Sequence, residues 1–387
     1  MSTKPRPTHM KTEKACTITF HASFNYGAVL QTFALRKVVE NLGYSCDVLD
    51  YIPSFREHYF YERPRLFDRR SHPVKSVGQY VLNAWVLRNK RALRYRRFCD
   101  FLSHACRLSP KRLKTIDDLR DAADDYDTFL CGSDQIWNTG YYQKDDGYFL
   151  NFVPPEKKKI AYAPSFGVAE LDADATDFVR NSLRSFHAIS TRESQGRKII
   201  RGFPGLDSQT VLDPTLLLTR DQWMEQAAPY PGIRPPYILC YFFSPELKRL
   251  ANHLKKQTRW PVYFLDLKGE SFFRGNVTSV YDAGPREFLT ILDNATIVLT
   301  TSFHGTAFSI NFNKPFVTQL LSERTSRKSV NARSLDLADR LGTSDRFFRT
   351  GMLEATDLAT MDYAPVNALL SQEREHSMRF LTTALET

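Results

Sequence analysis

The chain has 387 residues, of which 42% are hydrophobic and 25% charged, and its formal net charge is +10 at pH 7. This composition is typical of a folded soluble protein of about two or three domains, and it excludes wholesale disorder, collagen and coiled coil. Its apolar runs are too short to span a bilayer, and the polar N-terminus predicts no signal peptide. The six cysteines and nine histidines show no metal-ligand spacing, so we expect no metal site and a cytoplasmic protein.

The first part of the chain alternates strand-like and helical segments. An apolar run at 16–20, a helical pattern at 28–42 and a second strand at 45–51 form a β-loop-α-β unit, the basic element of a parallel sheet. A helical stretch is also predicted at 173–186. Further short strands are predicted at 126–131, 159–163, 187–191 and 210–212.

The positive charge is concentrated in an insert at about 54–115. Between residues 56 and 114 there are 16 Lys or Arg and 4 Asp or Glu. A helix is predicted at 76–104, in which aromatic residues are interleaved with cations. This helix could contact an anionic membrane through residues 88–97, hold a phosphorylated ligand, or be a solvated face whose aromatics pack inward. No zinc finger, RNP-like or helix-turn-helix pattern accompanies it, so we expect no nucleic-acid partner.

A second alternating series begins after residues 229–236, which hold four prolines and a glycine. The two series predict an α/β fold of two Rossmann-like domains facing across a cleft. We expect an N-terminal domain at 1–222 and a C-terminal domain at 223–387, whose last helix is a candidate to cross back to the first domain. Such sheets bind ligands at the carboxyl ends of their strands. The later elements are strands at 237–243, 262–267, 296–300 and 315–320, and helices at 245–257, 285–292, 305–312, 331–341 and about 366–384.

Two motifs have the chemistry to bind an anion. Asn25 and Gly27 open the first helix, where free N–H groups favour negative charge, although a plain helix cap by Asn25 is the alternative. Arg192 follows the strand at 187–191, and its planar fork can meet two oxygens at once. Glu193 could orient this fork, and the alternative for Arg192 is a surface ion pair.

A third motif suits a sugar. Asp134, Gln135 and Trp137 directly follow the strand at 126–131 and offer a carboxylate, an amide and a flat indole. Sugar hydroxyls are typically held by such planar polar groups, with an aromatic ring beneath the sugar. The alternative is a tight turn in which Asp134 caps a helix.

A histidine marks the fourth motif. His304 lies between a predicted strand and a predicted helix, beside a glycine, and both a structural and a catalytic role are open for it. The loop at 323–333 is cationic, so it could neutralise a phosphate or simply be solvated. Its candidate ligands are Arg324, Lys328 and Arg333.

In this order, the segments NYGAVLQTFAL, GSDQIWN, STRES, VLDPTLLL, TSFHGTAFSINFNKPFV and NARSLDLADRLG resemble the polysaccharide pyruvyl transferase family, over about residues 17 to 347. The resemblance implies a GT-B-like architecture of two Rossmann-like domains. It also implies transfer of the enolpyruvyl group of phosphoenolpyruvate onto two sugar hydroxyls, forming a pyruvate ketal and releasing phosphate. The acceptor would be a cell-surface polysaccharide or its lipid-linked precursor at the inner face of the cell membrane, with no cofactor besides the co-substrate phosphoenolpyruvate.

On this resemblance, His304 matches the family's essential histidine and Arg192 its donor-binding arginine. We expect His304 to protonate the methylene carbon of the donor, and Asp134 to orient the acceptor or take its proton. The expected donor-binding residues are Arg192, Ser302, Arg324, Lys328 and Arg333. The expected acceptor-binding residues are Asn25, Gly27, Asp134, Gln135 and Trp137, with Trp137 stacked on the sugar ring.

Two rival functions remain at this point. A glycosyltransferase that uses a nucleotide sugar could have the same two-domain architecture, because fold alone does not define the reaction. A non-catalytic, membrane-associated assembly protein could use the basic aromatic helix instead.

Overall fold

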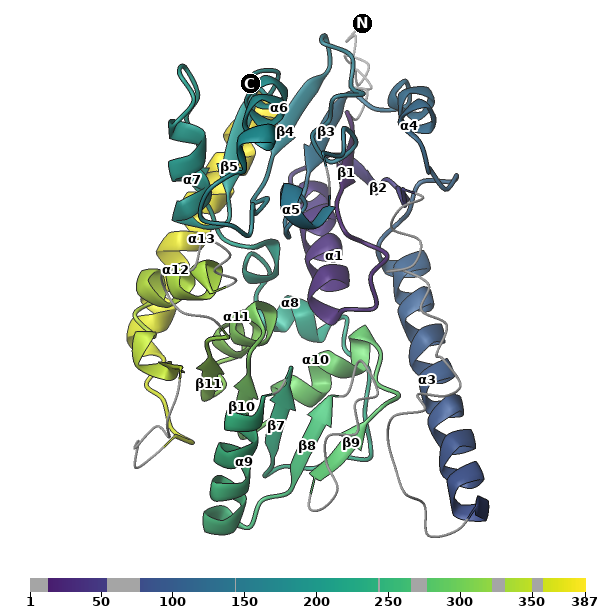
Figure 1. Ribbon diagram of the computed structural model, residues 1–387, viewed down its shortest axis with the longest axis vertical. Coiled ribbons are helices and arrows are strands. Elements are labelled where there is room, and N and C mark those ends of the chain that lie inside the picture. The colour runs from purple at the N-terminus through teal and green to yellow at the C-terminus, as the bar shows by residue number, and fades with distance from the viewer. Residues whose placement is uncertain are drawn as a thin grey trace, which may run out of the picture.

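The computed structural model describes residues 13–53, 77–142, 144–242, 244–265, 277–321, 331–349 and 358–387, and the side chains of 77–85 and 141–142 are not described. Within these ranges the chain forms two six-stranded sheets, each made of consecutive parts of the sequence (Figure 1).

The first sheet has the strand order β2-β1-β3-β4-β5-β6, and all its neighbouring strands are parallel. Its strands are β1 (Lys14–Ile18), β2 (Ser45–Val48), β3 (Thr128–Cys131), β4 (Lys158–Ala161), β5 (Ala188–Thr191) and β6 (Gln209–Thr210). The helices of this half are α1 (Tyr26–Asn41), α3 (Val77–Ala105), α4 (Ile116–Ala123), α5 (Thr139–Tyr142), α6 (Ala173–Leu183) and α7 (Ser194–Arg201).

The second sheet has the order β12-β11-β10-β7-β8-β9, again with parallel neighbours. Its strands are β7 (Ile238–Tyr241), β8 (Val262–Leu265), β9 (Val277–Val280), β10 (Ile297–Thr300), β11 (Phe316–Gln319) and β12 (Phe347–Phe348). The later helices are α8 (Arg220–Met224), α9 (Pro245–Thr258), α10 (Pro285–Asp293), α11 (Phe303–Asn311), α12 (Ala332–Leu341) and α13 (Ala364–Glu386). The predicted α/β class with two Rossmann-like halves is confirmed.

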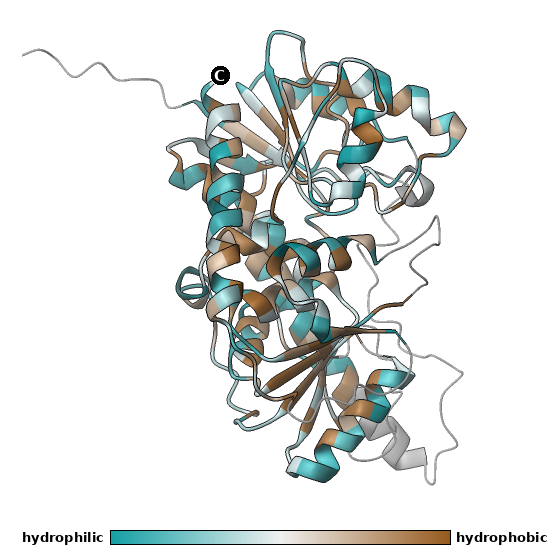
Figure 2. Ribbon diagram, turned by 90° about the vertical axis from the view of Figure 1, so that its left-hand side faces the viewer, coloured by the Kyte–Doolittle hydropathy of each residue, from teal (hydrophilic) through white to brown (hydrophobic). Residues whose placement is uncertain are grey.

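The central strands are mostly apolar, because helices cover both faces of a parallel sheet. Every residue of β3, β7 and β10 is buried. Figure 2 shows the strands of the second sheet as a block of hydrophobic residues between helices with mixed surfaces. Strands of this kind fix the position of the loops at their carboxyl ends, where side chains with reactive groups follow.

The two halves share a hydrophobic core, which includes residues of α1 and α10. The Tyr26 ring stacks on Phe288 with centroids 4.6 Å apart, and its hydroxyl donates to the carbonyl of Ala283 at 2.7 Å. The last helix, α13, also contacts the first half. Tyr44 donates to the carbonyl of Leu385 at 3.0 Å.

The basic helix is observed as α3, which runs along both halves (Figure 1). Arg97 of α3 pairs with the buried Glu287 of α10, with Nε and Oε1 3.2 Å apart. Arg88, Lys90 and Arg96 are exposed. Part of the cationic face is therefore used inside the fold. The membrane contact through residues 88–97 stays a prediction, which flotation with anionic liposomes tests.

Candidate active site

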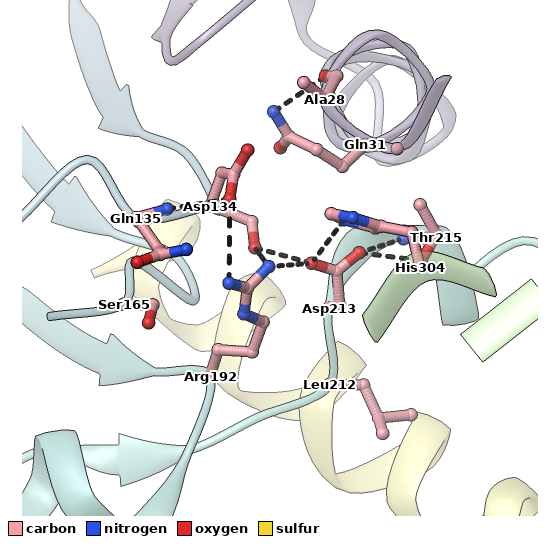
Figure 3. Close-up of polar contacts among 12 residues, drawn as sticks. Ala28, Gln31, Asp134, Gln135, Ser165, Arg192, Leu212, Asp213, Thr215 and His304 are labelled. Atoms are coloured by element: carbon pink, nitrogen blue, oxygen red, sulfur yellow. Dashed lines mark hydrogen bonds and ion pairs between the residues drawn. The ribbon is translucent and has the colours of Figure 1, made fainter. Parts of the chain in front are cut away.

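The carboxyl ends of the two sheets meet around three ionisable side chains (Figure 3). Arg192 directly follows β5, Asp213 lies shortly after β6, and His304 lies in the first turn of α11, shortly after β10. Their exposed fractions are only 3%, 1% and 7%. The first sheet therefore supplies a guanidinium and a carboxylate, and the second supplies an imidazole, in one nearly dry site.

Asp213 lies between Arg192 and His304. Its Oδ2 accepts a hydrogen bond from Arg192 Nη1 at 2.9 Å and lies 3.6 Å from His304 Nε2. Ser133 Oγ donates to the same oxygen at 2.7 Å, and Thr215 donates to Oδ1 through its backbone N–H and its hydroxyl.

The surroundings of Asp213 hold its carboxyl in the charged form. Burial alone would raise the pKa of Asp213, but the charge of His304, the guanidinium of Arg192 and the N–H of Thr215 outweigh it. The pKa of Asp213 is therefore well below its usual range, so a carboxylate stands beside His304 at any physiological pH.

Arg192 keeps donor groups that no described residue satisfies. Its Nε and Nη2 are buried without a hydrogen-bond partner, since Glu193 Oε2 and Asp134 Oδ1 are 3.9 and 3.7 Å away. The guanidinium lies 4.5 Å over the ring of Phe303. Burial alone would lower the pKa of Arg192, but Asp213, Asp134 and Glu193 raise it. A permanent cation thus has two N–H groups that form ion pairs with the nearby carboxylates but no hydrogen bonds among the described residues, so they can still donate to an anion that comes closer.

Gln135 and Arg333 lie on another wall of the site. Arg333 faces the same Phe303 ring at 5.8 Å. With its amide oxygen turned toward Arg333, Gln135 accepts from both terminal guanidinium nitrogens, at 3.0 and 3.1 Å. Arg333 and Arg192 therefore both lie against Phe303, and the donor-binding role predicted for the two arginines stays a prediction. The other predicted cations, Arg324 and Lys328, lie outside the described residues.

Three predicted residues shape the backbone around the site. Asn25 caps α1, because its Oδ1 accepts from Gly27 N at 2.9 Å, and Ser302 caps α11 by accepting from Gly305 N at 3.3 Å. Asp134 has a φ of 76° and its Oδ1 accepts from Gln135 N at 2.9 Å. The Asp134 carboxylate is about one-sixth exposed, with a side-chain exposed fraction of 17%.

The structure corrects the prediction for Trp137. This residue is fully buried, and its ring stacks on Phe149 with centroids 5.4 Å apart. Its indole N–H donates to the carbonyl of Tyr148 at 3.2 Å. Because the indole is enclosed in the core of the first half, it cannot stack on a sugar.

Gly27 contacts the catalytic candidate directly. A Cβ atom at this position would lie 2.2 Å from both Cγ and Nδ1 of His304, so alanine here must displace the ring. We expect Gly27→Ala to lower turnover by about 10²-fold, since a misplacement of about 1 Å has effects of that size. Helix α1 itself would tolerate alanine, because alanine is the better helix former.

Steady-state assays together with thermal unfolding test this prediction. Gly140→Ala is the matched control, because the nearest atom to its added Cβ is 3.6 Å away. Full activity of Gly27→Ala would show that the ring of His304 need not lie where the structure places it.

Asp213 and Ser133 are site residues that were not predicted from the sequence. Asp213 belongs to the segment VLDPTLLL, where it caps the short helical turn Pro214–Leu216 by accepting from Thr215 N. The signal was an acidic residue just beyond the predicted strand at 210–212, at the sheet edge that also carries Arg192.

Comparison with known proteins identifies the family. A family model described as polysaccharide pyruvyl transferase matches residues 25–318, which is more than half of the chain. The chain therefore belongs to the polysaccharide pyruvyl transferase family, a family of transferases. No curated protein sequence gives a significant match.

Several solved structures have a similar chain path at low identity. UDP-GlcNAc 2-epimerase of Methanocaldococcus jannaschii is 9% identical, with a TM-score of 0.48 over 96% of this chain and 100% of that one. The glycosyltransferase SsfS6 of Streptomyces sp. SF2575 is 12% identical, with a TM-score of 0.43 over 97% and 100%. MurG of Acinetobacter baumannii is 11% identical, with a TM-score of 0.39 over 96% and 94%. Such likeness does not extend to the reaction.

Two further features bear on the class of site. In the ranges that the structure describes, no three His, Cys, Asp or Glu side chains gather as ligands for a metal ion. None of the described helices combines the length and apolar character required to cross a bilayer.

Proposed function

We propose that the protein transfers the enolpyruvyl group of phosphoenolpyruvate to a sugar of a cell-surface polysaccharide or of its lipid-linked precursor. The products are a pyruvate ketal and phosphate, and phosphoenolpyruvate is a co-substrate, so the scheme requires no cofactor. Membership of the family supports this proposal. The observation that carries it is the chain of contacts from Arg192 through Asp213 to His304, in which Arg192 keeps two buried N–H groups without a hydrogen-bond partner in the described part of the chain.

The donor is a small molecule with a carboxylate and a phosphate, so it needs fixed cations. Arg192 offers Nε and Nη2 along one edge of its guanidinium, and an anion with two oxygens can accept from both. Arg333 faces the same Phe303 ring and supplies a second positive charge. One arginine for each anionic group of the donor is the simplest assignment.

The reaction requires a proton donor at the methylene carbon. A proton from His304 converts the methylene to a methyl group while C2 gains positive charge, and a sugar hydroxyl adds to C2. Its proton passes to Asp134 and then to the phosphate oxygen, which leaves with the electron pair of its bond to C2. The second hydroxyl adds to C2, closes the ketal and returns its proton to His304. Protons balance over the cycle, because the two hydroxyls supply one to the methyl group and one to phosphate.

The clamp formed by Arg192 is tested by Arg192→Lys. An ammonium cannot meet two oxygens in one plane, so we expect the KM for phosphoenolpyruvate to rise about ten- to hundredfold, in line with ~1.5–3 kcal/mol for a charged hydrogen bond. The measurement is phosphate release from phosphoenolpyruvate with a panel of p-nitrophenyl hexopyranosides. Arg201→Lys is the control, because Arg201 is an exposed arginine paired with Asp207. An unchanged KM in Arg192→Lys would reject the clamp.

The rival reaction, sugar transfer from a nucleotide sugar, is separated by ligand-induced stabilisation. A ligand that binds only the folded state raises the melting temperature. We expect phosphoenolpyruvate to raise it and UDP-, GDP- and CMP-sugars to leave it unchanged. The opposite result would favour the glycosyltransferase.

A further inference from the structure

Gln31 is a buried residue of α1, one helical turn after Gly27, and its side-chain nitrogen is fully used. Nε2 donates to Thr19 Oγ1 at 2.9 Å, to the carbonyl of Ala28 at 3.0 Å and to Thr32 Oγ1 at 3.1 Å. Three acceptors therefore surround a group that has two hydrogens.

These contacts fix which way the amide points. The carbonyl of Ala28 can only accept, and Thr32 already donates its hydroxyl hydrogen to that carbonyl at 2.8 Å. Thr19 donates its own to the carbonyl of Ser133 at 2.8 Å. Neither hydroxyl has a hydrogen left for Gln31, so the side of the amide that faces them must be the nitrogen. The carbonyl oxygen is held on the opposite side.

That oxygen, Gln31 Oε1, is buried and accepts no hydrogen bond from any residue in the described part of the chain. Figure 3 shows the side chain reaching from α1 toward Asp134, with the oxygen on the side that faces this carboxylate. Two hydrogen-bond acceptors, one an amide oxygen and one a carboxylate, thus lie on the same side of the site as His304 in this view. A ligand that satisfies them must bring donors.

The two proposed substrates differ in whether they can donate a hydrogen bond. Fully ionised phosphoenolpyruvate has no hydrogen-bond donor, whereas each sugar hydroxyl has one. We infer that Gln31 is an acceptor-binding residue whose Oε1 accepts a hydrogen bond from a hydroxyl of the sugar, while Asp134 receives the neighbouring hydroxyl. This inference rests on the proposed function and adds to it a residue that recognises the sugar and not the donor.

The experiment compares Gln31→Met with Thr32→Val, using phosphoenolpyruvate and the p-nitrophenyl hexopyranoside that the wild type turns over fastest. Methionine keeps the length of the side chain but removes both polar atoms. We expect kcat/KM for the pyranoside to fall at least about tenfold, the loss of a single hydrogen bond, while the KM for phosphoenolpyruvate stays within about twofold. Thr32→Val should leave both constants nearly unchanged, because two acceptors remain for the two hydrogens of Gln31.

Gln31→Glu is the second variant, and it covers the case in which Gln31→Met fails to fold. A buried carboxyl is driven to its protonated form, so it can donate to the carbonyl of Ala28 and still present an oxygen to the site. We therefore expect Gln31→Glu to retain most of the kcat/KM for the pyranoside.

The outcomes separate this inference from the proposed function. An unchanged kcat/KM for the pyranoside in Gln31→Met, with an active wild type, overturns the inference and leaves the function intact. Equal changes in the constants for both substrates assign Gln31 a structural role, which also overturns it. If the wild type releases no phosphate from phosphoenolpyruvate with any pyranoside, and phosphoenolpyruvate does not raise its melting temperature, the proposed function fails and the inference fails with it.

Discussion

Replacing His304 with glutamine is expected to lower turnover by about 10²–10⁴-fold, the range for loss of a general acid. Glutamine has nearly the length of histidine and keeps a hydrogen-bonding group toward Asp213, whose Oδ2 lies 3.6 Å from His304 Nε2. It cannot release a proton at neutral pH. The fold should survive, because the imidazole makes no hydrogen bond to the described residues, and phosphoenolpyruvate should still raise the melting temperature.

Heavy water provides the direct measurement for this step. The wild type should place one deuterium in the methyl group of the ketal at each turnover, and His304→Gln should form this product at the reduced rate. His253→Gln is a matched control, because His253 is an exposed histidine of α9. Full turnover by His304→Gln would remove the imidazole from the mechanism.

Asp213→Asn is expected to damage both stability and turnover. The carboxylate accepts from Arg192, Ser133 and Thr215, and its removal takes from a buried guanidinium its nearest counter-charge, the only one within hydrogen-bond distance among the described residues. Breaking such a buried pair typically lowers the free energy of unfolding by about 3–5 kcal/mol. Turnover should also fall, because an imidazolium at His304 would face Arg192 with no carboxylate between them.

The direction of the Asp213 pKa shift also predicts how the stability lost in Asp213→Asn should change with pH. The folded pKa of Asp213 is lowered, so the stability it contributes is fully present above the unfolded pKa of about 3.9 and is lost as the pH falls through the folded pKa. The difference between wild type and variant should therefore be constant at neutral pH and shrink only in strongly acidic solution.

Asp207→Asn is the control for the same substitution at the surface. Its partner Arg201 is exposed, and solvent screens such pairs, so the loss should be less than about 1 kcal/mol. A similar loss in both variants would contradict the structural importance assigned to Asp213.

Most of the regular elements could be predicted because their patterns are local. The strand predicted at 237–243 is β7 at Ile238–Tyr241, and the helix predicted at 76–104 is α3 at Val77–Ala105. No such local pattern marks β9 or β12. These strands lie at the two edges of their sheet, β12 has only two residues, and neither forms a continuous buried run. The domain boundary at 222/223 stays a prediction.

The candidate site could be predicted only in part, for a physical reason. His304 and Arg192 were found because a charged residue at a strand end stands out along the sequence. The contacts of Asp213 with Arg192 and His304 could not be predicted, because Asp213 is 21 positions from the first and 91 from the second along the chain. Trp137 was misplaced because composition shows that an indole is present, but not whether it points into the core. Gln31 carried no local signal, since its role depends on hydroxyl groups from other elements.

Under the proposed function, the contact between His304 and Asp213 has a consequence for the timing of the reaction. The imidazole belongs to the second sheet and the carboxylate follows the first, so the proton donor is complete only while the two halves are in contact. If the protein uses phosphoenolpyruvate as proposed, a separation of the two halves that admitted a large glycan would move the imidazole away from the carboxylate. Donor bound in that open state would have no proton source beside it, which would protect it from hydrolysis.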